Sequence, residues 1–84
     1  MTDNLPANEL DVKAALQAII DAADSTSAVN YAYTYAKAGK SMTGHALYVQ
    51  VLYTLNNITH WRGPEATTVR NVLKRYIKEY NNRR

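Results

Sequence analysis

Apolar residues recur at three- and four-residue intervals in this chain, and this spacing constrains the fold more than any other feature of the sequence. The clearest stripe consists of Leu47, Val51, Leu55 and Ile58. Because an α-helix has about 3.6 residues per turn, such spacing gathers apolar side chains on one helix face. Strands alternate every second residue and would not produce the pattern. The spacing therefore predicts an all-α fold.

Turns divide the pattern into four segments. We predict helices over residues 9–23, 28–38 and 44–60, and a fourth that begins at Pro64 and continues through Tyr80. Gly39 is the predicted stop of the second helix. Proline is tolerated in the first turn of a helix, so Pro64 fits the start of the fourth. The prediction is a compact bundle of about four short helices over residues 8–84, behind a flexible leader over residues 1–7.

Length and composition exclude several classes of protein. Eighty-four residues make one domain with a thin core, and some domains of this size gain burial by forming a homodimer. The chain has no cysteine, which excludes disulfides and cysteine nucleophiles and fits the reducing cytoplasm. No apolar run approaches the roughly 20 residues of a membrane-spanning helix. We therefore expect a cytoplasmic protein with no membrane partner.

Catalytic and ligand-binding motifs fail on inspection. Gly39-Lys40-Ser41 resembles the end of a phosphate-binding loop, but Thr34 stands where that loop needs its first glycine. The two histidines, His45 and His60, are fifteen residues apart and have no carboxylate at helical spacing. Most carboxylates of the first helix are expected on its solvated outer face. We predict no enzyme, no metal, no cofactor and no small-molecule substrate.

Charge is distributed unevenly along the chain. Residues 1–24 hold five carboxylates and one lysine, whereas residues 62–84 hold seven cations and two carboxylates. The cations of the last helix that could contact nucleic acid are Arg70, Lys74, Arg75, Lys78, Arg83 and Arg84. Three of them step by four residues, so one basic face could contact nucleic acid. Basic outer faces are also common on amphipathic helices, and this one could attract the acidic start of another copy.

Tyrosine is the unusual residue type, with seven copies and no phenylalanine. Tyr31, Tyr33 and Tyr35 alternate within the second segment, a pattern that would also suit a strand. Interleaved alanines and the Gly39 stop favour a helix, on which the three rings cannot all be buried. Because tyrosine combines contact area with a polar tip and is enriched at interfaces, these three are the predicted partner-binding residues.

The most distinctive stretch surrounds the corner between the third and fourth helices. It reads His60-Trp61-Arg62-Gly63-Pro64-Glu65-Ala66. We expect Trp61 to seal the end of the bundle, Arg62 to cap the last carbonyls of the third helix, and Gly63 to supply an unusual backbone conformation. Residues 52–74, about a quarter of the chain, resemble a pattern in small uncharacterised bacteriophage and prophage proteins. The resemblance implies a phage-type accessory protein that acts on a host component, and it supplies no catalytic residues.

Together these observations predict a non-enzymatic macromolecule-binding module. The expected partner is a protein, either a host protein or a second copy of the chain. Nucleic acid bound by the basic C-terminal helix is the alternative.

Overall fold

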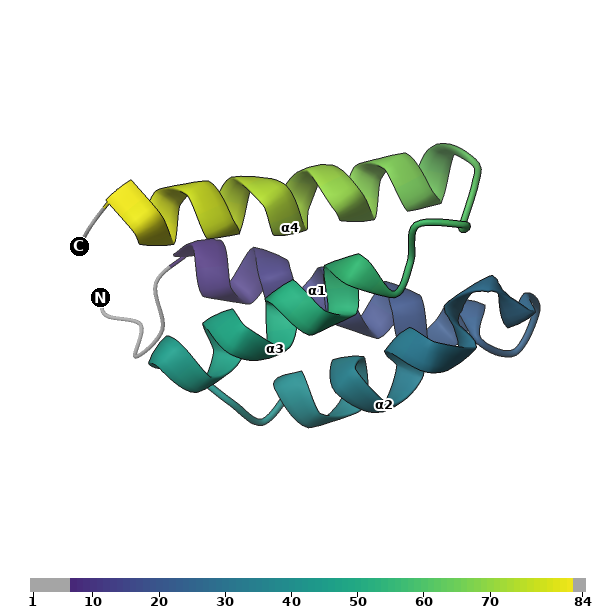
Figure 1. Ribbon diagram of the computed structural model, residues 1–84, viewed down its shortest axis with the longest axis horizontal. Helices are drawn as coiled ribbons and strands as arrows, with labels where there is room; N and C mark the ends of the chain where they lie inside the picture. The colour runs from purple at the N-terminus through teal and green to yellow at the C-terminus, as the bar shows by residue number, and fades with distance from the viewer. Residues whose placement is uncertain (1–6, 83–84) are drawn as a thin grey trace.

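The computed structural model describes residues 7–82, and this part of the chain is all-α and contains no strand. Its helices are α1 (Ala7–Ala22), α2 (Asn30–Gly39), α3 (Gly44–Asn56) and α4 (Pro64–Asn82), and a short 3-10 turn, η1 (Ser27–Val29), precedes α2 (Figure 1). The predicted bundle of four helices is confirmed. Residues 1–6 of the predicted leader lie outside the described residues, and Ala7 already belongs to α1.

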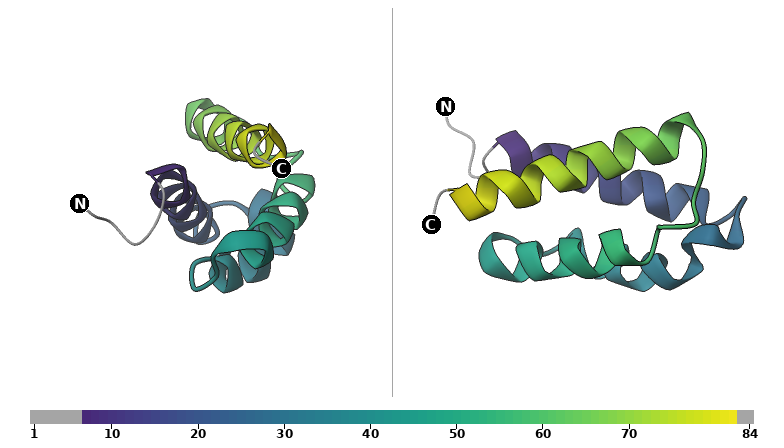
Figure 2. Two further views of the ribbon diagram at one scale, coloured as in Figure 1. Left: turned by 90° about the vertical axis from the view of Figure 1, so that its left-hand side faces the viewer. Right: turned by 45° about the horizontal axis from the view of Figure 1, so that its top comes forward.

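The four helices form an up-and-down bundle. Each helix runs antiparallel to the one before it, and the end-on view shows them arranged around a common centre (Figures 1 and 2). Helix α1 packs against α2 and α4, and α3 packs against the same two neighbours. The radius of gyration is 12.1 Å, close to the roughly 12 Å expected for a compact domain of this length. The single chain therefore closes its own core, whose largest fully buried side chains are Leu16, Ile19, Leu47, Ile58 and Leu73.

Small residues let α1 and α2 approach closely. Ala32 and Ala36 are fully buried on the inner face of α2. A Cβ added at Gly39 would lie 2.9 Å from Cδ1 of Leu16 on α1, too close for an unshifted contact. Within the described residues, positive φ angles occur only at Gly44 and Gly63. Helix α2 ends at Gly39, as predicted, but this glycine does not have the positive φ typical of a glycine stop, and its missing side chain makes room for α1.

A buried carboxylate from α1 caps the start of α3. The side chain of Glu9 is only 6% exposed. Its Oε1 accepts a hydrogen bond from Oγ1 of Thr43 at 2.5 Å, and its Oε2 accepts one from the backbone N–H of Gly44 at 3.1 Å. The first N–H groups of a helix lack partners within the helix, and the helix dipole favours a negative charge there. The expectation that the carboxylates of α1 are solvated is thus wrong for Glu9.

Helix α3 ends at Asn56, four residues before the predicted end. The N–H groups of Asn57 and Ile58 donate to the carbonyls of Thr54 and Leu55, three residues back, which tightens the last turn. The chain then turns inward, where Ile58 is fully buried and Trp61 is 6% exposed. Ile58 keeps the apolar spacing of α3 although it lies in the turn after the helix, because this turn brings its side chain back to the core. The spacing therefore predicted a longer helix than the structure has.

We predict that Glu9→Ala lowers the free energy of unfolding by about 1–3 kcal/mol, because it removes two hydrogen bonds that a buried carboxylate accepts at the start of α3. Urea denaturation followed by circular dichroism measures the change. Asp11→Ala, at an exposed carboxylate of the same helix, is the control and should change stability by less than about 0.5 kcal/mol. Equal effects of the two substitutions would show that Glu9 does not cap α3.

Candidate functional site

The corner between α3 and α4 is a structural unit, as its sequence suggested. Trp61 is buried against the core, Gly63 has a φ of 112°, and Pro64 begins α4. The carbonyl of Trp61 accepts a hydrogen bond from Nη1 of Arg70 at 2.7 Å, and the carbonyl of Ile58 accepts one from the same nitrogen at 3.3 Å. Arg70, from the second turn of α4, thus holds the connection between α3 and α4, beyond the last residue of α3.

The predicted cap, Arg62, is exposed and makes a longer contact. Its Nη1 donates to the carbonyl of Thr59 at 3.4 Å. Thr59 lies beyond the last residue of α3, so Arg62 contacts the turn and does not cap the helix. At the same corner, Gly63 has a positive φ and Pro64 is the first residue of α4.

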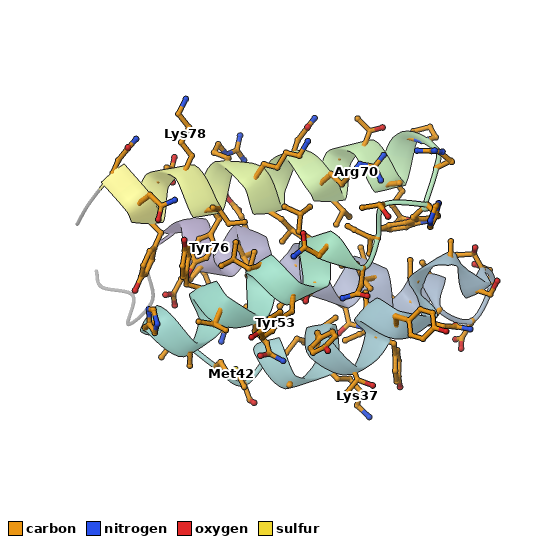
Figure 3. The ribbon with its side chains drawn as sticks, viewed as in Figure 1. Lys37, Met42, Tyr53, Arg70, Tyr76 and Lys78 are labelled. Atoms are coloured by element: carbon orange, nitrogen blue, oxygen red, sulfur yellow. The ribbon has the colours of Figure 1, made fainter. Side chains whose placement is uncertain are left out.

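The basic stripe of α4 divides into two parts. Arg70 is half-buried and held by the corner carbonyls. Lys74, Arg75 and Lys78 are exposed and have no hydrogen bond or ion pair to another described residue. Figure 3 shows Lys78 pointing away from the bundle, whereas Arg70 lies at the corner end of α4. The predicted Arg83 and Arg84 lie outside the described residues, so the free cations of α4 number three within residues 64–82.

The three tyrosines predicted to bind a partner, Tyr31, Tyr33 and Tyr35, do not all lie on one side of α2. Tyr31 is 81% exposed on the outer side of α2. Tyr35 is half-buried and packs against Tyr53 of α3, with ring centroids 5.5 Å apart. Tyr33 lies on a different side of α2, where Nζ of Lys37 sits 5.5 Å from its ring centroid. The structure therefore brings Tyr31, Tyr35 and Tyr53 to one face, and we call these three residues the tyrosine face.

Sequence reasoning missed Tyr53 as a member of this face. Tyr53 is 50% exposed, and Figure 3 shows it on α3 above α2. The antiparallel pairing of α2 with α3 brings it beside Tyr35, and the amide of Gln50 reinforces the pairing by donating to the Tyr35 carbonyl at 3.5 Å. The available signal was the short turn after Gly39, which predicts antiparallel neighbours but does not fix which residues meet.

Three other tyrosines join α3 to α4. The rings of Tyr48 and Tyr80 stack with centroids 4.2 Å apart, and Tyr76 is buried beside them. The hydroxyl of Tyr48 donates to Oδ1 of Asn81 at 2.9 Å, and Nδ1 of His45 lies 3.2 Å from the hydroxyl of Tyr80. These contacts explain much of the tyrosine content without a partner, because the rings hold the start of α3 against the end of α4.

A groove that the sequence did not predict runs along the other helix pair. It lies between α1 and α4 and has a volume of about 380 Å³. Its lining residues are Asp11, Ala14, Ala15, Ala18, Glu65, Thr68, Val69, Val72 and Arg75. The floor is apolar, and the charged residues stand toward its ends.

Other kinds of site were also considered. Across the described side chains, no group of three histidine, aspartate or glutamate residues is placed to hold a metal ion. Nor does any described helix have the length and apolar character needed to cross a membrane. Comparison of the chain with protein-family models, curated proteins and solved structures gave no significant match. Function is therefore inferred from the surfaces described above.

We predict that Arg70→Ala lowers the free energy of unfolding by about 1–3 kcal/mol, because two carbonyls at the corner lose a charged donor. Lys74→Ala is the matched control: it removes an exposed cation one turn later and should change stability by less than about 0.5 kcal/mol. Thermal and urea unfolding of both variants measure the difference. If Arg70→Ala is as stable as Lys74→Ala, the corner does not depend on Arg70.

Proposed function

We propose that this chain is a non-enzymatic protein-binding module whose tyrosine face contacts a protein partner. The observation that carries the proposal is the position of Tyr31, which leaves 81% of a large aromatic side chain in solvent beside the paired rings of Tyr35 and Tyr53. Among the described residues, the Tyr31 side chain makes no hydrogen bond or ring contact, so the fold does not use it.

The physical character of the tyrosine face suits a protein contact. Tyrosine is enriched at interfaces because two rotatable bonds fix a large amphipathic surface at a small entropic cost. The contact between Tyr35 and Tyr53 holds two of the three rings in place before any partner arrives. A pre-positioned ring loses less conformational freedom on binding than a mobile one, so more of its contact energy appears as affinity.

The stretch of chain that carries the tyrosine face has no carboxylate, so nothing in this stretch repels an acidic partner surface. No aspartate or glutamate occurs between residues 25 and 64, whereas Lys37 and Lys40 belong to this stretch. Lys37 lies beside Tyr33, on a different side of α2, and Lys40 contacts Gln17 of α1, so neither lysine belongs to the tyrosine face. A contact at the tyrosine face therefore depends on aromatic area more than on charge. If the resemblance to phage proteins holds, the partner is a bacterial host protein.

The test uses capture of a partner from bacterial lysate by the immobilised chain. We expect Tyr31→Ser combined with Tyr53→Ser to lose a protein that the parent chain retains, because both exposed rings are removed. Tyr33→Ser is the matched control, since it changes the same residue type on the same helix but on a different side. Circular dichroism checks that each variant stays folded. Retention of the same protein by the double variant, or failure of the parent to retain any, would contradict the proposal.

A second candidate function is nucleic-acid binding by α4, favoured by the exposure of Lys74, Arg75 and Lys78 without partners among the described residues. Exposed cations on one helix can neutralise phosphates and release counterions. Arg70 is not part of this face because the corner carbonyls hold it.

If α4 binds nucleic acid, Lys74→Glu with Lys78→Glu should abolish a gel shift of duplex DNA or single-stranded RNA at low salt, because phosphates would meet carboxylates. Lys37→Glu with Lys40→Glu makes the same change of net charge on the other helix pair and should leave the shift nearly intact. A parent chain that gives no shift at low salt excludes this function.

A further inference from the structure

The two carboxylates of α4 lie on the side of this helix that faces α1. Glu65 lines the groove between the two helices. Glu79 stands four residues after Arg75, which lines the same groove, and residues four apart share a side of a helix. Negative and positive groups therefore alternate along the α1 side of α4, and this side offers no continuous positive surface.

Lys74 and Lys78 lie toward the other side of α4, next to α3. They follow Arg70 at four-residue steps, and Arg70 contacts the carbonyls of the connection from α3. Asn81, three residues after Lys78, accepts a hydrogen bond from the hydroxyl of Tyr48 on α3. Both lysines are exposed and have no hydrogen bond or ion pair to a described residue. They stand about 6 Å apart along the helix axis, so two positive charges follow each other on this side.

Helix α3 adds no opposing charge to the lysine side of α4. Residues 41–61, which include all of α3, contain no aspartate, glutamate, lysine or arginine. A negatively charged chain that lay along α4 on this side would therefore meet lysines of α4 and no carboxylate of α3. This arrangement favours a polyanion as the ligand.

An exposed aromatic ring stands where this side reaches the end of α4. His45, the second residue of α3, is exposed, and its ring centroid lies 5.9 Å from that of Tyr48 and 6.2 Å from that of Tyr80. Its Nδ1 is 3.2 Å from the hydroxyl of Tyr80, which stands two residues after Lys78. These contacts position the ring and leave part of it in water. Nucleic-acid bases stack on exposed aromatic side chains, histidine among them.

We propose that Lys74, Lys78 and His45 form a site for single-stranded nucleic acid, with phosphates at the two lysines and one base stacked on His45. The inference rests on nucleic-acid binding by α4, the second candidate function, and names its substrate. Paired bases are stacked inside a duplex and offer no ring face to His45. A helix in the major groove also has a phosphate strand on either side, and Glu65 and Glu79 would meet one of them.

The probe is a fluorescent single strand of mixed sequence, about 12 nucleotides long, and the comparison is the duplex that it forms with its complement. Fluorescence anisotropy at low ionic strength should show the single strand bound about 5-fold more tightly or better, because only its bases can stack on His45. Equal or tighter binding of the duplex would overturn this inference and leave nucleic-acid binding standing. Binding of neither probe would contradict both.

The salt dependence of binding tests the phosphate contacts. Lys74→Gln and Lys78→Gln should each reduce the slope of log K against log salt concentration by about 0.7, the value for one phosphate of a single strand. Lys37→Gln removes an exposed lysine of α2 and is the matched control, which should leave the slope unchanged. If both α4 variants keep the parent's slope, the two lysines do not contact phosphates and the proposal fails.

The stacking contact is tested at His45. His45→Ala should weaken binding of the single strand by about 5-fold or more and keep the parent's salt slope, because it removes a ring and no phosphate contact. His45→Phe keeps an aromatic ring and should bind like the parent. His60→Ala, at the exposed histidine beyond the other end of α3, is the matched control and should have no effect. Circular dichroism and thermal unfolding confirm that the variants are folded. Unchanged binding by His45→Ala, or an equal loss in His45→Phe, would overturn the proposal.

Discussion

The buried carboxylate of Glu9 fixes where α3 begins, and the positions of both helix pairs follow from it. Glu9 comes from the first turn of α1 and accepts hydrogen bonds from Thr43 and Gly44, so it joins two helices that are diagonal in the bundle. Helix α1 also meets α2 through the close approach of Leu16 to Gly39, and it forms the groove with α4. One helix thus sets the place of the other three. Because a carboxylate is costly to bury without partners, this contact favours one packing arrangement over others that would place the same apolar stripes together.

The two helix pairs present different chemistry to solvent. The outer side of α2 and α3 carries exposed tyrosines in a stretch of sequence without any carboxylate. The groove of α1 and α4 has an alanine and valine floor with carboxylates toward both ends. Sequence position explains the contrast: the acidic residues are concentrated in the first helix, and folding places that helix against the last.

Regular features of the fold could be predicted from the sequence, whereas features that depend on distant contacts could not. Apolar spacing predicted the four helices, and Gly63-Pro64 predicted the corner, because these signals act over a few residues. The end of α3 was misplaced because Ile58 keeps the helical spacing although the chain has already turned. The close contact of Gly39 with α1 and the burial of Glu9 were not predicted, because they depend on Leu16 and on Gly44, which are far away in sequence. In the candidate surfaces, Tyr31 could be anticipated from composition, but the pairing of Tyr53 with Tyr35 and the groove required the helix arrangement.

Some surface side chains hold the fold together, and these can be separated from the side chains that stay free to contact another molecule. Arg70 appeared equivalent to Lys74 in the sequence, yet its guanidinium is held by the carbonyls of Ile58 and Trp61. Tyr48 and Tyr80 similarly stack on each other and tie α3 to α4. By contrast, Tyr31 is largely in solvent, and Lys74 and Lys78 have no hydrogen bond or ion pair to other described residues. Exposed aromatic area and free lysines do little to stabilise a folded monomer. Their contribution would arise in a complex, where another molecule supplies the missing contacts.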